Sequence, residues 1–520
     1  MDAEVCIIGA GAAGGIMALE LARRGVEVAV LESGPRHDFR QRRDYVRRYL
    51  NHENPWRTSV TGLDRYSGSG AATNFLGGKQ VRGVGGGTLH WEGYALRLHA
   101  DDFRMRSLYG IADDWPISYM DLERWYARAE RALGVAGTAD DPWASPRSTP
   151  FPLPAFPFSY SDGLFARTCR SLGIALHSMP QARNSVAYGG RSQCRACGTC
   201  HVCPTGAKAS TDLTHVPEAE ATGKARVLTD ATVLSLDVDH SGQVSAAVYA
   251  RSDKVEHRVT ARVFVVAAGA VETVRLLLLS SSREFPEGLA NRSGLVGKFF
   301  MSHPSVDVTA RASDKVYPYR IGFSTAMSRQ FAIARDRAAR GAFFLEFLNS
   351  AGPTPDEIAA ASGLWGGALR QRVRDEFGRR VGIRIYCEQL PERGNGVSLD
   401  ANARDYFGNP VAHLHYNVGV YEQEALEEAK AVAGQIFKAM GLTDIRPAAL
   451  TFAGHLIGTH RMGNDPHTSV VDPDLRAHDV PNLYLVGSGC FVTSSASPPT
   501  LTIAALAIRA AEHIAVRLHG

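Results

Sequence analysis

The chain opens with a strand–helix–strand pattern of apolar positions. Residues 5–8 form a short apolar run that ends at Gly9, an amphipathic repeat continues to about Arg24, and a second apolar run covers Glu27–Leu31. Short apolar runs next to glycine are typical of buried strands, and the repeat between them is typical of a helix. The opening pattern therefore predicts a β–α–β unit.

Further apolar patterns predict more strands and helices along the chain. Strands are expected at Val227–Asp237, at Val244–Ala250 and, fully buried, at Arg262–Ala268. Helices are expected at Asp121–Leu133, in the arginine-rich stretch Ala359–Arg380, and at Glu422–Met440, where Gly441 ends the helix. Pro146–Pro157 is predicted to be a proline-rich connector.

Size and charge narrow the class of protein. A chain of 520 residues favours two or three domains. A net charge of +4, with 21% charged residues, predicts neither nucleic-acid binding nor attachment to a membrane surface. Charges at Glu272, Arg275, Arg509 and Glu512 interrupt the two longest apolar stretches, so no transmembrane segment is expected. No signal peptide is predicted before the first strand.

The first glycines carry a nucleotide-binding pattern, Gly9-x-Gly11-x-x-Gly14, between the first strand and the helix. Gly9 suits a tight turn, Gly11 a close approach of the backbone to a pyrophosphate, and Gly14 close packing of helix on strand. The helix N-terminus presents free N–H groups to the anion. Glu32, at the end of the second strand, stands where an acid accepts hydrogen bonds from ribose hydroxyls. We therefore predict a dinucleotide site.

Half of the chain's eight cysteines fall within ten residues, in the pattern C-x2-C-x2-C-x2-C-P. They are Cys194, Cys197, Cys200 and Cys203, followed by Pro204. Zinc sites usually use two separated C-x2-C pairs, and a catalytic disulfide needs only two cysteines. Closely repeated C-x2-C ending in Cys-Pro is typical of iron–sulfur ligation, although ferredoxins place three residues before the last cysteine. We expect a 3Fe-4S or 4Fe-4S cluster rather than zinc, and the pattern does not identify an unused cysteine.

Several segments together resemble the glucose–methanol–choline (GMC) oxidoreductase family, whose members bind FAD. They are residues 5–16, 82–92, 115–117, 263–277, 295–297, 455–463 and 482–502. Within that family the chain is most similar to the catalytic subunits of bacterial FAD-dependent sugar dehydrogenases, which hold an iron–sulfur centre at this place in the chain. The resemblance spans the whole sequence.

The resemblance implies an α/β fold with two interleaved domains. A discontinuous, Rossmann-like FAD-binding domain is expected at residues 1–100, 205–300 and 450–520. An α+β substrate domain with an antiparallel sheet is expected at 101–204 and 301–449, with the cysteine cluster at 194–203. Substrate contacts are expected from loops in 301–449.

The resemblance also implies the catalytic residues. His455 stands where the family's catalytic histidine precedes Gly-Thr, and its ordinary pKa near 6.5 suits a base at neutral pH. His460 is expected to point elsewhere. The family usually places a second His or an Asn near the following Thr-x-Thr, where this chain has Pro498. The substrate hydroxyl is then held by His455 alone, by a neighbour such as Ser497, or by water.

The remaining site residues expected from the resemblance bind the cofactor. Gly86, Thr88 and His90 are expected near the isoalloxazine, and backbone N–H groups of residues 487–489 near the pyrophosphate. The full set of expected FAD-binding residues is Gly9, Gly11, Gly14, Glu32, Gly86, Thr88, His90, Val233, Gly489 and Thr500.

These features predict an FAD-dependent dehydrogenase that oxidises a hydroxyl of a sugar, glycoside or polyol to a carbonyl. Electrons are expected to pass through the iron–sulfur cluster to a cytochrome or quinone, and the resemblance implies a small helper subunit. Alternatives are an oxidase that tailors an aminosugar or cyclitol with oxygen, a lyase on the same fold, and a non-enzymatic electron carrier. A cytoplasmic location is expected from the reduced thiols, with periplasmic co-export beside a signal-bearing partner as the alternative.

Overall fold

The computed structural model describes residues 1–56, 62–71, 76, 79–318, 322–333 and 336–519. A parallel sheet is assembled from distant parts of the chain, in the order β22-β11-β1-β2-β7. Its strands are β1 (Ala3–Ile8), β2 (Val28–Leu31), β7 (Ala225–Leu228), β11 (Ala261–Val266) and β22 (Leu483–Leu485). Each of these strands lies within the ranges expected for the FAD-binding domain.

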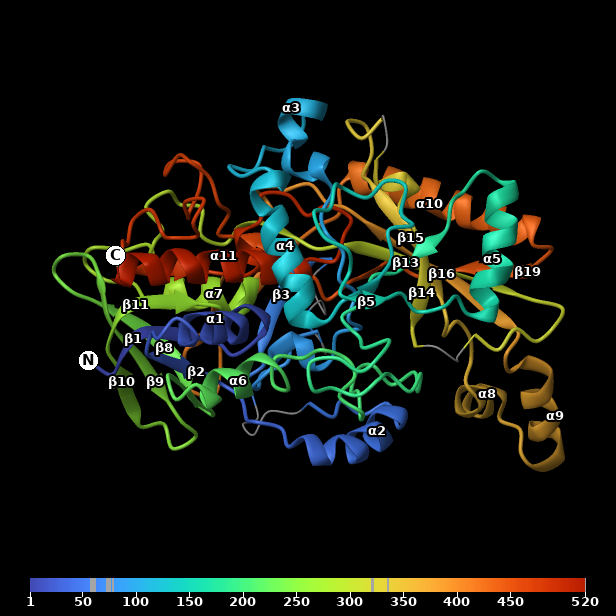
Figure 1. Ribbon diagram of the computed structural model, residues 1–520, viewed down its shortest axis with the longest axis horizontal. Helices are drawn as coiled ribbons and strands as arrows, with labels where there is room; N and C mark the ends of the chain where they lie inside the picture. Colours follow the sequence, from blue (N-terminus) through green and yellow to red (C-terminus); the bar gives the residue numbers. More distant parts are fainter. Residues whose placement is uncertain (57–61, 72–75, 77–78, 319–321, 334–335, 520) are drawn as a thin grey trace.

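Helices cover the parallel sheet. Helix α1 (Ala12–Ala22) packs against α11 (Thr500–His519) and α6 (His215–Ala221), and α11 packs against α4 (Tyr119–Leu133). Helix α7 (Gly269–Leu279) follows β11 and contacts β8 (Thr232–Val238). The antiparallel sheet β10-β9-β8 is completed by β9 (Val244–Ala250) and β10 (Glu256–Val259). Figure 1 places both chain ends in this half of the molecule.

A second large sheet forms the other half, in the order β19-β13-β16-β15-β14-β6, with β20 paired to β13. Its strands pair antiparallel. They are β6 (His177–Ser178), β13 (Pro304–Arg311), β14 (Ser324–Ser328), β15 (Phe343–Leu348), β16 (Arg380–Cys387), β19 (Thr443–Pro447) and β20 (Thr451–Phe452). Helix α10 (Val420–Ala439) packs on β13 and β16, and α5 (Tyr160–Ser171) packs on α10. This sheet and these helices enclose a separate apolar core.

A further sheet, β21-β12-β17-β18-β3, is shared by segments from both halves. Its strands are β3 (Tyr66–Gly70), β12 (Lys298–Met301), β17 (Gly396–Arg404), β18 (Pro410–Tyr416) and β21 (Ile457–Thr459). The short strands β4 (Ala136–Gly137) and β5 (Leu153–Pro154) pair with each other, and α2 (Arg42–Leu50) and α3 (Met105–Tyr109) lie in connecting segments. Helices α8 (Pro355–Ser362) and α9 (Gly366–Glu376) lie together at the lower right of Figure 1.

Two predicted elements are interrupted. The strand expected over Val227–Asp237 is two strands, because Asp230 adopts a left-handed φ of 53° between β7 and β8. The helix expected over Ala359–Arg380 is split into α8 and α9. Gly363, with φ of 61°, ends α8, and Gly366, also with φ of 61°, is the first residue of α9. In both cases the apolar pattern of the sequence continues across a backbone turn, so the pattern predicts one element where the structure has two.

Candidate active site

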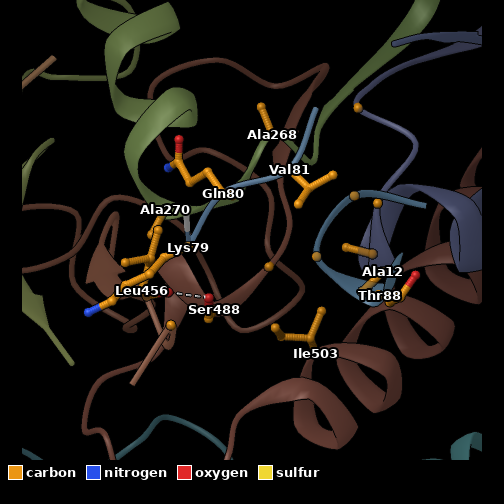
Figure 2. A pocket seen from close by; sticks show the side chains of 18 of the residues that line it. Ala12, Lys79, Gln80, Val81, Thr88, Ala268, Ala270, Leu456, Ser488 and Ile503 are labelled. Atoms are coloured by element: carbon orange, nitrogen blue, oxygen red, sulfur yellow. Dashed lines mark hydrogen bonds between the residues drawn. The ribbon is translucent and has the colours of Figure 1, made fainter. Parts of the chain in front are cut away.

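The candidate site is a cavity of about 610 Å³ between the two halves, a volume in the usual range for ligand pockets. It opens at the carboxyl ends of β1, β11 and β22, the edge where α/β sheets bind ligands. Figure 2 shows Ala12 and Thr88 together on one wall, Ile503 below them, and Lys79, Leu456 and Ser488 on the opposite wall. Ser305, Arg384 and Tyr386, on β13 and β16 of the second large sheet, also line the cavity.

Glu32 lies at one end of the cavity with its carboxylate fixed by backbone amides. Its Oε2 accepts from the amide of Ala10 at 2.9 Å, and its Oε1 accepts from the amides of Gly34 and Gly83 at 2.9 and 3.0 Å. The residue is only 5% exposed. Because a carboxylate oxygen can accept more than one hydrogen bond, Oε2 retains capacity for a ligand hydroxyl.

The glycines of the N-terminal motif, together with Gly86, allow two close backbone approaches. Gly9 has φ of +100°, and a Cβ at Gly14 would lie 1.9 Å from the carbonyl oxygen of Gly9. Gly86 has φ of +49°, and a Cβ there would lie 2.9 Å from Cα of Gly11. Gly9, Gly11 and Gly86 line the cavity, whereas Gly14 serves the packing of α1 on β1. The N-terminus of α1 is thus left open to an anionic ligand.

The other residues predicted to bind the cofactor divide into two groups. Thr88, His90, Val233 and Thr500 line the cavity. Gly489 does not contribute to the lining. A Cβ there would lie 1.9 Å from the ring of His460, so Gly489 gives that buried histidine its space. The neighbouring residues 487 and 488 do line the cavity.

His455 lies at the far end of the cavity, where a second histidine contacts it. Nδ1 of His303 is 2.7 Å from Nδ1 of His455, and the two rings meet edge to face. His303 precedes β13, is fully buried, and was not identified from the sequence. Burial lowers the pKa of His303 to about 4. Burial, followed by the charges of His303 and Lys79, holds the pKa of His455 well below its ordinary value. Both rings are therefore neutral near pH 7.

The expected neighbours of His455 differ in their placement. Pro498 lines the cavity. Ser497 is buried with its hydroxyl 3.3 Å from Nη2 of Arg329, and it does not line the cavity. His460 is buried outside the lining beside Thr459 Oγ1, as expected for a histidine that points elsewhere.

Glu92, His201, Ser305 and Arg384 form a polar wall of the cavity. Oε1 of Glu92 lies 3.5 Å from Nε2 of His201 and 3.7 Å from Nη1 of Arg384. Arg384 also makes a bidentate pair with Asp307, at 2.7 and 3.0 Å. Oε2 of Glu92 and Oγ of Ser305 are buried and have no hydrogen-bond partner within the described residues. These oxygens give the wall unused capacity to bind hydroxyl or ammonium groups.

A buried acid lies behind this wall. Tyr94, which lines the cavity, donates a short hydrogen bond from its hydroxyl to Oε1 of Glu346. Glu346 is fully buried on β15, and this burial raises its pKa to about 8. Glu346 is consequently protonated near pH 7, and the wall carries one negative charge fewer than its sequence suggests.

The cysteine segment lies beside the cavity. Sulfur atoms of Cys194 and Cys200 are 3.7 and 4.0 Å from Nη1 of Arg183, and the sulfur of Cys203 accepts from the amide of Lys208 at 3.2 Å. Cys197 is exposed, with its sulfur 3.1 Å from Thr199 Oγ1. None of the eight cysteines, all of which lie in the described part of the chain, forms a disulfide. Across the described residues, no three His, Cys, Asp or Glu side chains are arranged to hold a metal ion.

Two residues connect the cysteine segment with the cavity. His201, next to Cys200, lines the cavity directly. Lys208 is fully buried, and its ammonium nitrogen donates to the carbonyls of Thr88, Leu89 and Trp91 at 3.1, 3.0 and 2.7 Å. The backbone of the cavity wall is thus hydrogen-bonded to Lys208, five residues after Cys203.

The fold and the site define a dinucleotide-binding α/β protein whose cavity extends from the parallel sheet to His455 and to strands of the second large sheet. Comparison with known families matches residues 2–45 to an FAD binding domain, and residues 155–305 and 391–507 to GMC oxidoreductase. The chain belongs to the GMC oxidoreductase family, which acts on alcohol groups of sugars and polyols, and FAD is its cofactor.

Individual relatives support this placement over the full length. The chain is 33% identical to the fructose dehydrogenase large subunit of Gluconobacter japonicus, covering 99% of this chain and 98% of the relative. It is 30% identical to paromamine 6'-oxidase of Streptomyces fradiae, covering 98% and 91%. A formate oxidase variant of Aspergillus oryzae RIB40 has the same fold, with a TM-score of 0.69 and 16% identity over 99% and 98% of the chains. Of the helices within the described residues, none is long and apolar enough to cross a bilayer.

Proposed function

We propose that this flavoprotein is a dehydrogenase that oxidises a hydroxyl of a sugar, glycoside or polyol to a carbonyl. The observation that carries the proposal is His455, a neutral histidine held at the far end of the FAD cavity beside a polar wall. A neutral imidazole can take the hydroxyl proton, and the wall can hold the remaining hydroxyls of a polyhydroxylated substrate.

The proposed FAD site uses the cavity-lining members of the predicted set. Glu32 would hold ribose hydroxyls, the N-terminus of α1 would face the pyrophosphate, and Gly86, Thr88 and His90 would line the isoalloxazine. The bound flavin supplies a two-electron acceptor for a hydride. His455 removes the hydroxyl proton, while Glu92 and Ser305 orient the substrate carbon through its neighbouring hydroxyls.

We further propose an iron–sulfur cluster on the cysteine segment. The C-x2-C spacing supports it, and so do the grouping of Cys194 and Cys200 at one guanidinium and the N–H bond to Cys203. Cys197, exposed and turned toward Thr199, is the proposed non-ligand. Such a cluster would supply one-electron transfer to an external acceptor, with a cytochrome or quinone and a small helper subunit as the proposed partners. A cytoplasmic location, or periplasmic co-export with that partner, remains a prediction.

One alternative has specific support. The likeness to paromamine 6'-oxidase favours an oxidase that uses oxygen on an aminosugar or cyclitol. In that case the cysteine segment is a structural part of the cavity wall.

An anaerobic titration of the purified holoprotein tests the proposal. The panel contains a ketohexose, a polyol, an aminosugar and a sugar acid, and the flavin absorbance is followed before air or a dye is admitted. Bleaching by a sugar or polyol with fast dye reduction and slow reaction with oxygen is expected. Fast reoxidation by oxygen would favour the oxidase, and a flavin that no member of the panel bleaches would refute both.

Cysteine variants test the cluster separately. We expect iron and acid-labile sulfide in the wild type and in Cys197→Ser, and their loss in Cys194→Ser, Cys200→Ser and Cys203→Ser. The matched variant Cys197→Ser keeps the same substitution within the same segment. Iron-free wild-type protein purified without oxygen would contradict the cluster and leave the flavin chemistry untouched.

A further inference from the structure

His303 does not line the cavity, and it contacts the cavity-lining His455. Nδ1 of His303 lies 2.7 Å from Nδ1 of His455, and Nε2 of His303 lies 3.4 Å from the carbonyl oxygen of Ser494. His303 is 0% exposed, so water does not compete for either nitrogen. These two contacts therefore determine which ring nitrogen of His303 carries the proton.

The Ser494 carbonyl determines the tautomer of His303. A carbonyl oxygen only accepts, so Nε2 of His303 must carry a proton to make this contact. Burial keeps the ring neutral near pH 7, and a neutral imidazole has one N–H. Nδ1 of His303 is then an acceptor, which requires Nδ1 of His455 to be the donor.

Donation through Nδ1 leaves the other nitrogen of His455 without a proton. His455 is also neutral by burial, so its single N–H is committed to His303. Nε2 of His455 makes no hydrogen bond within the described part of the chain. His455 itself lines the cavity.

We propose that His303 is a positioning residue that holds His455 in the Nδ1–H tautomer, so that the bare Nε2 serves as the base toward the substrate hydroxyl. This inference rests on the proposed alcohol oxidation. It also accounts for Pro498, because the partner of the base is supplied from the connection between β12 and β13 rather than from the segment before α11.

The proton and electron balance of the step is simple. The substrate O–H bond breaks and an N–H bond forms at Nε2 of His455. The substrate C–H bond would break as a hydride accepted by oxidised FAD, which would thereby be reduced by two electrons, and the carbonyl C=O bond would form. His455 becomes an imidazolium, and its Nδ1–H still donates to His303. The positive charge on His455 is then stabilised by a hydrogen-bond chain. Nδ1 of His303 accepts from His455, and the carbonyl of Ser494 accepts from Nε2 of His303.

The acceptor end of this chain is held rigidly. Ser494 Oγ accepts from the amide of Gln389 at 2.8 Å and donates to the carbonyl of Gln389 at 2.9 Å. The side chain of Gln389 accepts from the amide of Ser302, next to His303, at 2.8 Å. Gln389, which follows β16, thus hydrogen-bonds both to Ser494, whose carbonyl contacts the His303 ring, and to the residue that precedes His303.

Two substitutions at His303 separate positioning from general stability. Asn places an amide oxygen near the former Nδ1 and can still accept from His455, whereas Leu cannot. In anaerobic stopped-flow with the substrate found for the wild type, we expect His303→Leu to slow flavin reduction at saturating substrate by about 10- to 100-fold. His303→Asn should remain within about 3-fold of wild type, and substrate Kd should change little in either variant. His215→Leu removes a buried histidine outside the cavity and is the matched control.

The outcomes distinguish this inference from the proposed function. Equal rates for His303→Leu and wild type, or equal slowing in the Asn and Leu variants, would overturn the positioning role. A wild type that no sugar or polyol reduces would overturn the proposed function. If the Leu variant does not retain FAD, nitrogen-15 NMR of histidine-labelled wild-type holoprotein tests the tautomer of His455 instead. We expect a protonated Nδ1 on His455, and a protonated Nε2 with a bare Nδ1 would refute the tautomer.

Discussion

Replacing Glu346 by Gln should remove a pH-dependent cost to stability. In the folded protein burial raises the pKa of Glu346 to about 8, from an ordinary value of 4.5. Between these values the folded state keeps a proton that the unfolded state has lost. The free energy of unfolding therefore falls as pH rises through this window, by about 1.4 kcal/mol per pH unit. Gln cannot ionise, and its amide oxygen can still accept from Tyr94.

The size of the effect follows from the window. From pH 5.5 to 7.5 the cost grows by about 3 kcal/mol. An unfolding entropy of about 2.1 cal/mol/K per residue makes this about 2 to 3 °C in Tm for a chain of this length. The difference in Tm between Glu346→Gln and wild type should therefore be about 2 to 3 °C larger, in favour of the variant, at pH 7.5 than at pH 5.5.

Thermal melts of the holoprotein at matched scan rates measure this difference. Glu424→Gln, an exposed change on α10, is the matched control and should follow wild type at both pH values. If Glu346→Gln also runs parallel to wild type, Glu346 is ionised in the folded protein, and the charge balance assigned to the polar wall is wrong.

Three further changes probe the cavity. Gly14→Ala should abolish FAD retention, because its Cβ would lie 1.9 Å from the carbonyl oxygen of Gly9. The control Gly434→Ala, which has open space around it in α10, should retain FAD with an unchanged or slightly higher Tm. The flavin absorbance per protein measures FAD retention in the two variants. Glu92→Gln should raise KM for a polyhydroxylated substrate by about 10-fold or more but leave that for a simple alcohol nearly unchanged, and equal effects on both would exclude a contact with distal hydroxyls. His455→Ala should slow flavin reduction by about 100- to 10,000-fold in stopped-flow, and a loss below 10-fold would exclude it as the base.

The nucleotide end of the cavity was predictable because its signals are local. The strand, glycines, helix and acid lie within about thirty residues, and each has a backbone reason to occur in that order. The predicted strand at Glu27–Leu31 and β2 at Val28–Leu31 agree within one residue. His455 and the cavity-lining members of the predicted set also occupy one cavity, although their roles toward FAD stay predictions.

The substrate end was not predictable because its partners are distant in sequence. His303 and His455 are 152 residues apart, and a histidine before Pro304 carries no signal of its own. Arg384 did carry a sequence signal, because a charged residue within the apolar run of β16 needs a buried partner. The spacing of the cysteines indicated a ligand site, but their grouping depends on left-handed backbone at Ala196 and Cys203, which the spacing does not reveal.

The strand order of the parallel sheet has a consequence for biosynthesis. β1 pairs with β2 within the first 31 residues, but its other neighbour, β11, is made only after residue 260, and β22 closes the sheet near residue 485. The N-terminal glycine motif therefore leaves the ribosome long before the rest of its binding cavity exists. FAD acquisition is then a late event, and a nascent or prematurely ended chain exposes an apolar strand edge that makes it a substrate for chaperones and proteases.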